Sequence, residues 1–342
     1  MDLKSQALKG VSWVFIGNFT NSISGFIKII ILTNFLNPSD FGLFAIVNIV
    51  IGFSAIFLDV GFSVAILHKN KLTPLEFSSL YWTNFIFCSF IFIIVYFSSG
   101  IFAEYYGKIE LKNLIIISAI GIVFSALGKL FRVQEEKKMN FKFITIIDVC
   151  AAIASTLVAV YFAYFDYGVI SLVYSSLFFI VSSNVCFFVY GLYKRKNNLL
   201  LFSLNSIREY FNLGLFYTLE QTVNYMSKEI DLLIIGKFYS IEILGFYSLA
   251  KQLVLKPFSI INPIFVKVCT PVFALMQNNK LNLSNGYCKL ITTISALNLP
   301  IYFILFCFAK PIILFLYGIE FIDSYLYLRL LIVFVIIIAF RN

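Results

Sequence analysis

Apolar segments of about twenty residues, the length of helix that crosses the hydrocarbon core of a bilayer, follow one another along the whole chain. A β-barrel would instead show short segments of alternating polarity. We therefore predict an all-α polytopic membrane protein with about ten transmembrane helices. The expected spans are residues 11–33, 41–66, 79–102, 112–133, 143–165, 167–192, 210–235, 244–275, 286–309 and 325–341.

The composition agrees with this pattern, because 61% of the 342 residues are hydrophobic and only 13% are charged. Soluble domains are nearer to half apolar and one quarter charged. The connections between spans are short and leave no room for an extramembrane domain. The net charge of +9 does not indicate nucleic-acid binding, because Lys and Arg gather in the loops on one side of the membrane.

The loops alternate between rich and poor in positive charge, and this asymmetry sets the orientation. The N-terminus and four loops are rich in positive charge. The N-terminus contains Lys4 and Lys9, and the loops contain, in order, Lys69 and Lys71; Arg132, Lys137, Lys138 and Lys142; Lys194, Arg195, Lys196 and Arg208; and Lys280. The opposite loops contain Lys108, Lys112, Lys237 and Lys310. Basic loops stay in the cytoplasm. We therefore expect a cytoplasmic N-terminus, with residues 34–40, 103–111, 166, 236–243 and 310–324 as outward loops.

An internal repeat predicts two helix bundles. A shift of 203 residues superposes Asn21 on Asn224, Ser24 on Ser227, Ile27 on Ile230, Phe35 on Phe238 and Gly42 on Gly245. An even number of spans separates the copies, so they have the same orientation, as in transporters with a substrate path between two bundles. The basic loop Lys194–Arg208 divides them. We expect a six-helix lobe at residues 1–200 and an incomplete lobe of about four helices at residues 201–342.

Polar side chains inside the first and seventh spans are the candidates for function, because charges in a membrane usually face a protein interior or a water-filled cavity. Asn18, Asn21, Gly25 and Lys28 share one helical face, as do Glu220, Asn224, Ser227 and Asp231, with Lys228 at the edge and Glu229 opposite. The repeat places Lys28 and Asp231 at similar depth. Three interpretations stay open: a polar cavity that contacts substrate or a coupling ion, a buried Lys–Asp pair that joins the bundles, and packing within one bundle.

The eighth span contains Lys251 and Lys256 together with Pro257, Pro263 and Pro271. Each proline removes a helical hydrogen bond, so we expect a bent helix. Its lysines are suited to a phosphate-containing substrate, because ammonium groups pair with phosphate. Asp59 and Asp148 are single carboxylates in apolar spans. Each has two interpretations: a raised pKa and proton carriage, or the capping of a neighbouring helix.

The sequence does not indicate an enzyme, a cofactor or a metal site. The six cysteines lie in or beside apolar segments, without the spacing of a metal or redox motif. Neither a Ser/His/Asp set nor a glycine-rich phosphate loop is apparent. The candidate residues therefore favour transport over catalysis.

Several segments resemble one family in their order and spacing. They are Thr33–Ala45, Phe57–Phe62, Ala65–Leu67, Ile230–Gly236, Leu244–Tyr247 and Pro271–Ala274. Together they resemble the polysaccharide transporters of the Wzx type, which include lipopolysaccharide, colanic acid and teichuronic acid exporters. These belong to the multidrug/oligosaccharidyl-lipid/polysaccharide flippase superfamily.

The resemblance implies a multi-pass protein of the bacterial inner (plasma) membrane. Such a flippase moves an undecaprenyl-pyrophosphate-linked oligosaccharide, the repeat unit of O-antigen, capsule or exopolysaccharide, to the outer leaflet by alternating access. A central cationic cavity, coupling to protons or sodium, and contact with polysaccharide assembly proteins are implied as well. By position, Lys28, Lys251 and Lys256 match candidates for the pyrophosphate or an acidic sugar. Asp231 and Asp59 match aspartates in the seventh and second spans of the family.

Two alternatives have their own expected features. A drug or cation antiporter of the same superfamily would share the topology but would carry acidic rather than lysine-rich cavity residues. A polysaccharide polymerase or ligase would need a sizeable outward loop with arginines, which this chain lacks. Members of the resembled family have twelve or more spans, so the second lobe is expected to be incomplete, as in a fragment or a chain completed by a partner.

Overall fold

A computed structural model describes residues 3–58, 63, 66–67, 73–194, 202–203, 208–276 and 280–341. Each of the ten expected spans overlaps a helix within these ranges, which confirms an all-α architecture. The helices are α1 (Leu3–Leu32), α2 (Pro38–Ile56), α4 (Pro74–Tyr106), α5 (Glu110–Lys137), α6 (Phe141–Tyr164), α7 (Val169–Lys194), α8 (Arg208–Phe238), α9 (Ile241–Met276), α10 (Lys280–Cys307), α11 (Ala309–Tyr317) and α12 (Ser324–Arg341).

Local sequence signals fix several helix ends. Proline is the first residue of both α2 and α4, where its missing N–H is no loss. At α4 the Thr73 hydroxyl accepts from the Glu76 N–H at 3.3 Å, and the Glu76 carboxylate accepts from the Thr73 N–H at 2.9 Å. This reciprocal pair is a capping box. Gly107 follows the last residue of α4, and its φ of +65° is left-handed backbone that glycine adopts without strain.

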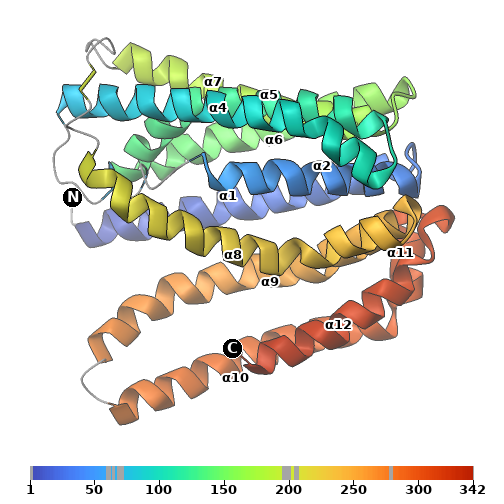
Figure 1. Cartoon of the computed structure of the whole chain (residues 1–342). Coiled ribbons are helices and arrows are strands. Elements are labelled where there is room, and N and C mark those ends of the chain that lie inside the picture. Colours follow the sequence, from blue (N-terminus) through green and yellow to red (C-terminus); the bar gives the residue numbers. More distant parts are fainter. Residues whose placement is uncertain are drawn as a thin grey trace.

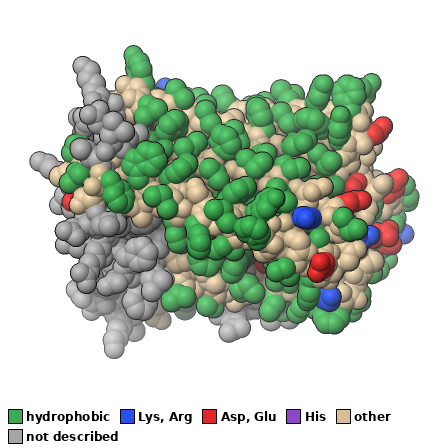
Figure 2. Space-filling view, turned by 45° about the horizontal axis from the view of Figure 1, so that its top comes forward, with side chains coloured by type: hydrophobic (Ala, Val, Ile, Leu, Met, Phe, Trp, Pro, Cys, Tyr) green, Lys and Arg blue, Asp and Glu red, His purple; other side chains and the backbone are tan. Residues whose placement is uncertain are grey.

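The described part of the chain contains seven helices that are long and apolar enough to cross a membrane. They are Ser12–Leu32 of α1, α2, α4, α5, α6, α7 and Gly286–Cys307 of α10. Figure 2 shows the surface that such helices present: a broad belt of hydrophobic side chains, with Lys, Arg, Asp and Glu side chains gathered toward one end. We also expect α8, α9 and α12 to span, although they are not among these seven.

The helices pack as a larger N-terminal bundle and a smaller C-terminal one (Figure 1). In the first, α5 packs against α4 and α7, and α6 packs against α7 and α1. In the second, α9 packs against α8, α10 and α12. We call them the N-lobe and the C-lobe. We call the end of the molecule with the N-terminus, on the left in Figure 1, the N-terminal face, and the other end the opposite face.

The lobes meet where α2 and α9 begin, near the opposite face, and the contact is reciprocal. A Cβ atom added at Gly42 would overlap the carbonyl oxygen of Ile241, and one added at Gly245 would overlap that of Pro38. Both pairs are related by the same 203-residue shift, which superposes Pro38 on Ile241 and Gly42 on Gly245. A contact in which each copy uses the same surface is the signature of a two-fold axis. The predicted parallel repeat is therefore visible as geometry.

One expectation differs from the structure. Residues 310–324 were expected to be an outward loop, but they contain most of α11 and a short 3-10 helix at Ile319–Phe321. The helix was missed because nine residues are too few to span a bilayer, so the segment lacked a length signal. Pro257, Pro263 and Pro271, which predict a bend in the eighth span, lie within α9 (Ile241–Met276).

Candidate functional site

Two half-buried lysines, one from each lobe, are candidates for contact with substrate. The ammonium group of Lys256 on α9 acts electrostatically on that of Lys28 on α1. Lys28 also donates to the Ser175 hydroxyl of α7 at 3.4 Å. Like charges inside a membrane protein are costly unless something compensates them. Lys28 and Lys256 are therefore the candidates for an interaction with an anionic ligand.

A second cluster joins α8 to α9 within the C-lobe. The ammonium group of Lys251 donates to Asp231 Oδ1 at 2.9 Å, to Glu229 Oε2 at 3.1 Å and to the carbonyl oxygen of Lys228 at 2.5 Å. The hydroxyl of Tyr247 donates to the other oxygen of Asp231 at 2.6 Å. Only 12% of the Lys251 side chain is exposed. All three protons of this ammonium group therefore have acceptors.

The partner of Asp231 differs from the one that the repeat would place nearest to it. Asp231 pairs with Lys251 of its own lobe, and Lys28 contacts Ser175 instead. This arrangement corresponds to packing within one bundle, one of the three interpretations of the sequence. Glu229, expected on the opposite face of the helix, reaches the same ammonium group.

An arginine that the sequence assigned only to topology forms the third cluster. Arg132 of α5 donates to both oxygens of Asp148 on α6, at 3.1 and 2.8 Å, and to Glu136 at 3.2 Å. The Ser183 hydroxyl of α7 donates to Asp148 at 3.0 Å. The buried Asp148 therefore has an ion-pair partner, which neither of its two sequence interpretations included.

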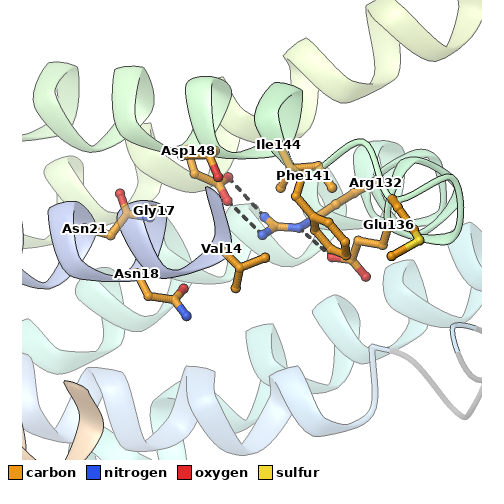
Figure 3. A pocket seen from close by; sticks show the side chains of 11 residues that line it. Val14, Gly17, Asn18, Asn21, Arg132, Glu136, Phe141, Ile144 and Asp148 are labelled. Carbon is orange, nitrogen blue, oxygen red and sulfur yellow. Dashed lines mark hydrogen bonds and ion pairs between the residues drawn. The ribbon is translucent and has the colours of Figure 1, made fainter. Parts of the chain in front are cut away.

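A cavity of about 440 Å³ lies beside this ion pair, between α1, α5 and α6 (Figure 3). Its lining includes Asn18 and Asn21 of α1 together with Arg132, Glu136 and Asp148. The side-chain oxygen of Asn21 is buried and has no hydrogen-bond donor among the described residues.

The remaining candidates are more dispersed. Glu220, Asn224 and Lys228 are exposed on α8. Asp59 lies outside the described residues.

The sequence contained an indication of the Arg132–Asp148 ion pair that a hydropathy analysis does not detect. The turn between α5 and α6 lies at Met139 and Asn140, and each partner is eight residues from Asn140. Two antiparallel helices joined by a tight turn place such residues at equal depth. A charge-bearing pair equidistant from a helical turn is therefore a candidate ion pair.

Comparison with known proteins relates the chain to polysaccharide biosynthesis proteins. The sequence profile of polysaccharide biosynthesis proteins matches residues 31–326. The teichuronic acid biosynthesis protein TuaB of Bacillus subtilis (strain 168) is 25% identical over 87% of this chain and 62% of its own length. The lipopolysaccharide biosynthesis protein WzxC of Escherichia coli (strain K12) is 24% identical over 88% and 61%. The chain spans about three fifths of the length of these relatives.

Solved structures share the fold. The lipid II flippase MurJ in an inward closed conformation matches 92% of this chain and 71% of its own, with a TM-score of 0.73 and 16% identity. An inward-facing multidrug resistance transporter of the MATE family matches 94% and 78%, with a TM-score of 0.69 and 14% identity. The profile match covers most of the chain, and the two-lobed helical fold agrees with it. The chain belongs to the family of polysaccharide biosynthesis proteins.

Proposed function

We propose that this protein takes part in flipping an undecaprenyl-pyrophosphate-linked oligosaccharide from the inner to the outer leaflet of the bacterial inner membrane. The proposal covers the substrate, the direction and the mechanism of alternating access. The family, and the names of the relatives that match it, support this assignment.

The observation that carries the proposal is the pair of lysines, Lys28 of the N-lobe and Lys256 of the C-lobe. An anionic ligand that contacts both lysines would be attracted by two positive charges. A pyrophosphate group supplies at least two negative charges and pairs with ammonium groups as point charges. Because the lysines belong to different lobes, such a ligand interacts with both lobes at once.

The contact between the lobes supports a mechanism of alternating access. The reciprocal contact of Gly42 and Gly245 lies near the opposite face, at the start of α2 and α9. We propose that the lobes pivot about this close backbone contact. A pivot near one face would change the separation of the lobes at the N-terminal face, and with it the access to Lys28 and Lys256.

A drug or cation antiporter is the second candidate, because the MATE transporter shares the fold. The charge of the region between the lobes separates the two functions. A cationic drug would be repelled by Lys28 and Lys256, whereas a diphosphate would be attracted. We therefore favour the flippase.

The test is export of surface polysaccharide in a strain that lacks the endogenous gene and is complemented with the full chain. We expect Lys28→Glu and Lys256→Ala each to abolish export, because the first reverses and the second removes a charge at the anion site. Immunoblotting of membrane fractions checks that both variants reach the membrane. Lys112→Ala is a matched control, because this exposed lysine lies near the opposite face. Export at the wild-type level in both lysine variants would refute the proposal.

A further inference from the structure

The cavity beside Arg132 lies within the N-lobe and is lined by three helices. Its polar lining consists of Asn18 and Asn21 from α1, Arg132 and Glu136 from α5, and Asp148 from α6. Val14, Phe141 and Ile144 supply apolar surface next to these groups (Figure 3). A volume of about 440 Å³ lies in the range of small-molecule sites, which combine apolar surface with a few polar groups.

The cavity is not an anion site, although it contains an arginine. The Arg132 guanidinium group already donates two hydrogen bonds to Asp148 and one to Glu136. One cation therefore faces two carboxylates, and the charged lining has a net charge of −1. Phosphate or an acidic sugar would meet repulsion rather than a free cationic group.

The cavity has hydrogen-bonding capacity that the protein does not use. The buried side-chain oxygen of Asn21 has no donor among the described residues. Asn18, one turn earlier on α1, is exposed and lines the same cavity. Amide groups both donate and accept hydrogen bonds, and carboxylates accept them. Hydroxyl groups of an uncharged ligand match this set, because each can donate one hydrogen bond and accept others.

The position of the cavity relates it to the lysine pair. Asn18, Asn21 and Lys28 lie on one face of α1, at spacings of three and seven residues. Seven residues of helix correspond to about 10 Å. This separation is comparable to the reach of a diphosphate and the first sugar ring attached to it. A ligand with its diphosphate at Lys28 would therefore place that sugar in the cavity.

We infer that the cavity is a subsite for an uncharged, hydroxyl-rich sugar, the unit attached directly to the diphosphate. This inference rests on the proposed function. Asn21 and Asn18 bind hydroxyl groups of the sugar, and the apolar side chains pack against its C–H surface. The Arg132–Asp148 ion pair holds α5 and α6 together and keeps the charge of the cavity unfavourable for uronic acids.

Binding to the full chain in lipid nanodiscs tests the inference with three probes. They are undecaprenyl pyrophosphate alone, the same lipid bearing glucose, and the same lipid bearing glucuronic acid. For the wild-type protein we expect the glucosyl lipid to have the lowest dissociation constant. Asn21→Leu should raise that constant about tenfold, the loss expected for one or two neutral hydrogen bonds, and should leave binding of the bare lipid unchanged. Unchanged binding of the bare lipid also reports that the variant is folded.

Two further variants separate the subsite from the lysine pair. Lys28→Gln should weaken all three probes, because each carries the diphosphate. Asn113→Leu, at an exposed asparagine of α5 outside the cavity lining, should change none. The subsite is overturned if Asn21→Leu affects the bare and glucosyl lipids equally, if it affects neither, or if glucuronosyl lipid binds wild type as tightly as glucosyl lipid. Full binding by Lys28→Gln, with a selective effect of Asn21→Leu, would instead overturn the lysine site and retain the subsite.

Discussion

At the scale of single residues, Lys251 is best explained as the residue that joins α8 to α9. Its ammonium group faces Asp231 and Glu229, and the Tyr247 hydroxyl completes the hydrogen bonding of Asp231. Breaking a buried ion pair leaves the remaining charge uncompensated and costs about 3–5 kcal/mol. Here the two carboxylates are 34% and 26% exposed, so water screens part of that cost.

We predict that Lys251→Met destabilises the protein by about 1–3 kcal/mol. This range is below the cost of breaking a fully buried ion pair, because solvent screens the two carboxylates. The midpoint of thermal unfolding in detergent should fall accordingly. The double variant Lys251→Met/Asp231→Asn should be less destabilised, because only Glu229 is then unpaired. Lys228→Met is the control, since its side chain is exposed and only its backbone carbonyl contacts Lys251. An unfolding midpoint for Lys251→Met equal to that of wild type would show that the cluster contributes nothing to stability.

At the scale of elements, the contact between α2 and α9 depends on two glycines. A methyl group at either Gly42 or Gly245 would collide with a backbone carbonyl, which cannot rotate away as a side chain can. The helices would have to separate. We predict that Gly42→Ala and Gly245→Ala both lower stability, although alanine is favoured over glycine in a helix by about 1 kcal/mol.

Thermal unfolding of the two variants measures this effect, and Gly100→Ala is the control. Gly100 is also helical, but nothing lies within 4 Å of a Cβ atom added there. The Gly100→Ala variant should therefore unfold at a slightly higher temperature than wild type, by the gain expected from helix propensity alone. Equal midpoints for all three variants would contradict the close backbone contact.

The helices were readable from the sequence, whereas their pairings were not. Length and hydropathy located helices that overlap all ten expected spans, because a bilayer imposes both properties on any helix that crosses it. Neither property encodes lateral contacts. The sequence placed Lys28 and Asp231 at similar depth but did not reveal that Lys251 is the partner of Asp231. Arg132 was assigned only to topology because hydropathy does not report its ion pair with Asp148, for which the equal distances to the α5–α6 turn were the available signal.

At the scale of the whole molecule, the repeat was detectable in the sequence because the 203-residue shift superposed matching residues. The sequence did not show how the two copies contact each other. In the structure, Gly42 lies against Ile241 and Gly245 lies against Pro38. The repeat relates the lobes by a two-fold axis, but it does not determine which face of the protein lies in the cytoplasm.

The charges at the two ends of the molecule predict the orientation. Arg132, Lys137, Lys138 and Lys194 lie at or near the helix ends of the N-terminal face, and Lys108 and Lys237 lie toward the opposite face beside Glu104 and Glu242. Basic segments are retained in the cytoplasm during insertion, whereas acidic residues contribute little. The N-terminal face is therefore expected to be cytoplasmic, which would place the cavity beside Arg132, near the turn between α5 and α6, toward the cytoplasm.

Cysteine accessibility in intact cells tests this orientation. In a parent chain with its native cysteines replaced, Lys108→Cys should react with a membrane-impermeant thiol reagent. Lys138→Cys should react only after the membrane is permeabilised. Both positions are exposed, so labelling of both in permeabilised cells controls for reactivity. The reverse pattern would place the cavity beside Arg132 on the outside, and the direction of transport proposed for this protein would then be wrong.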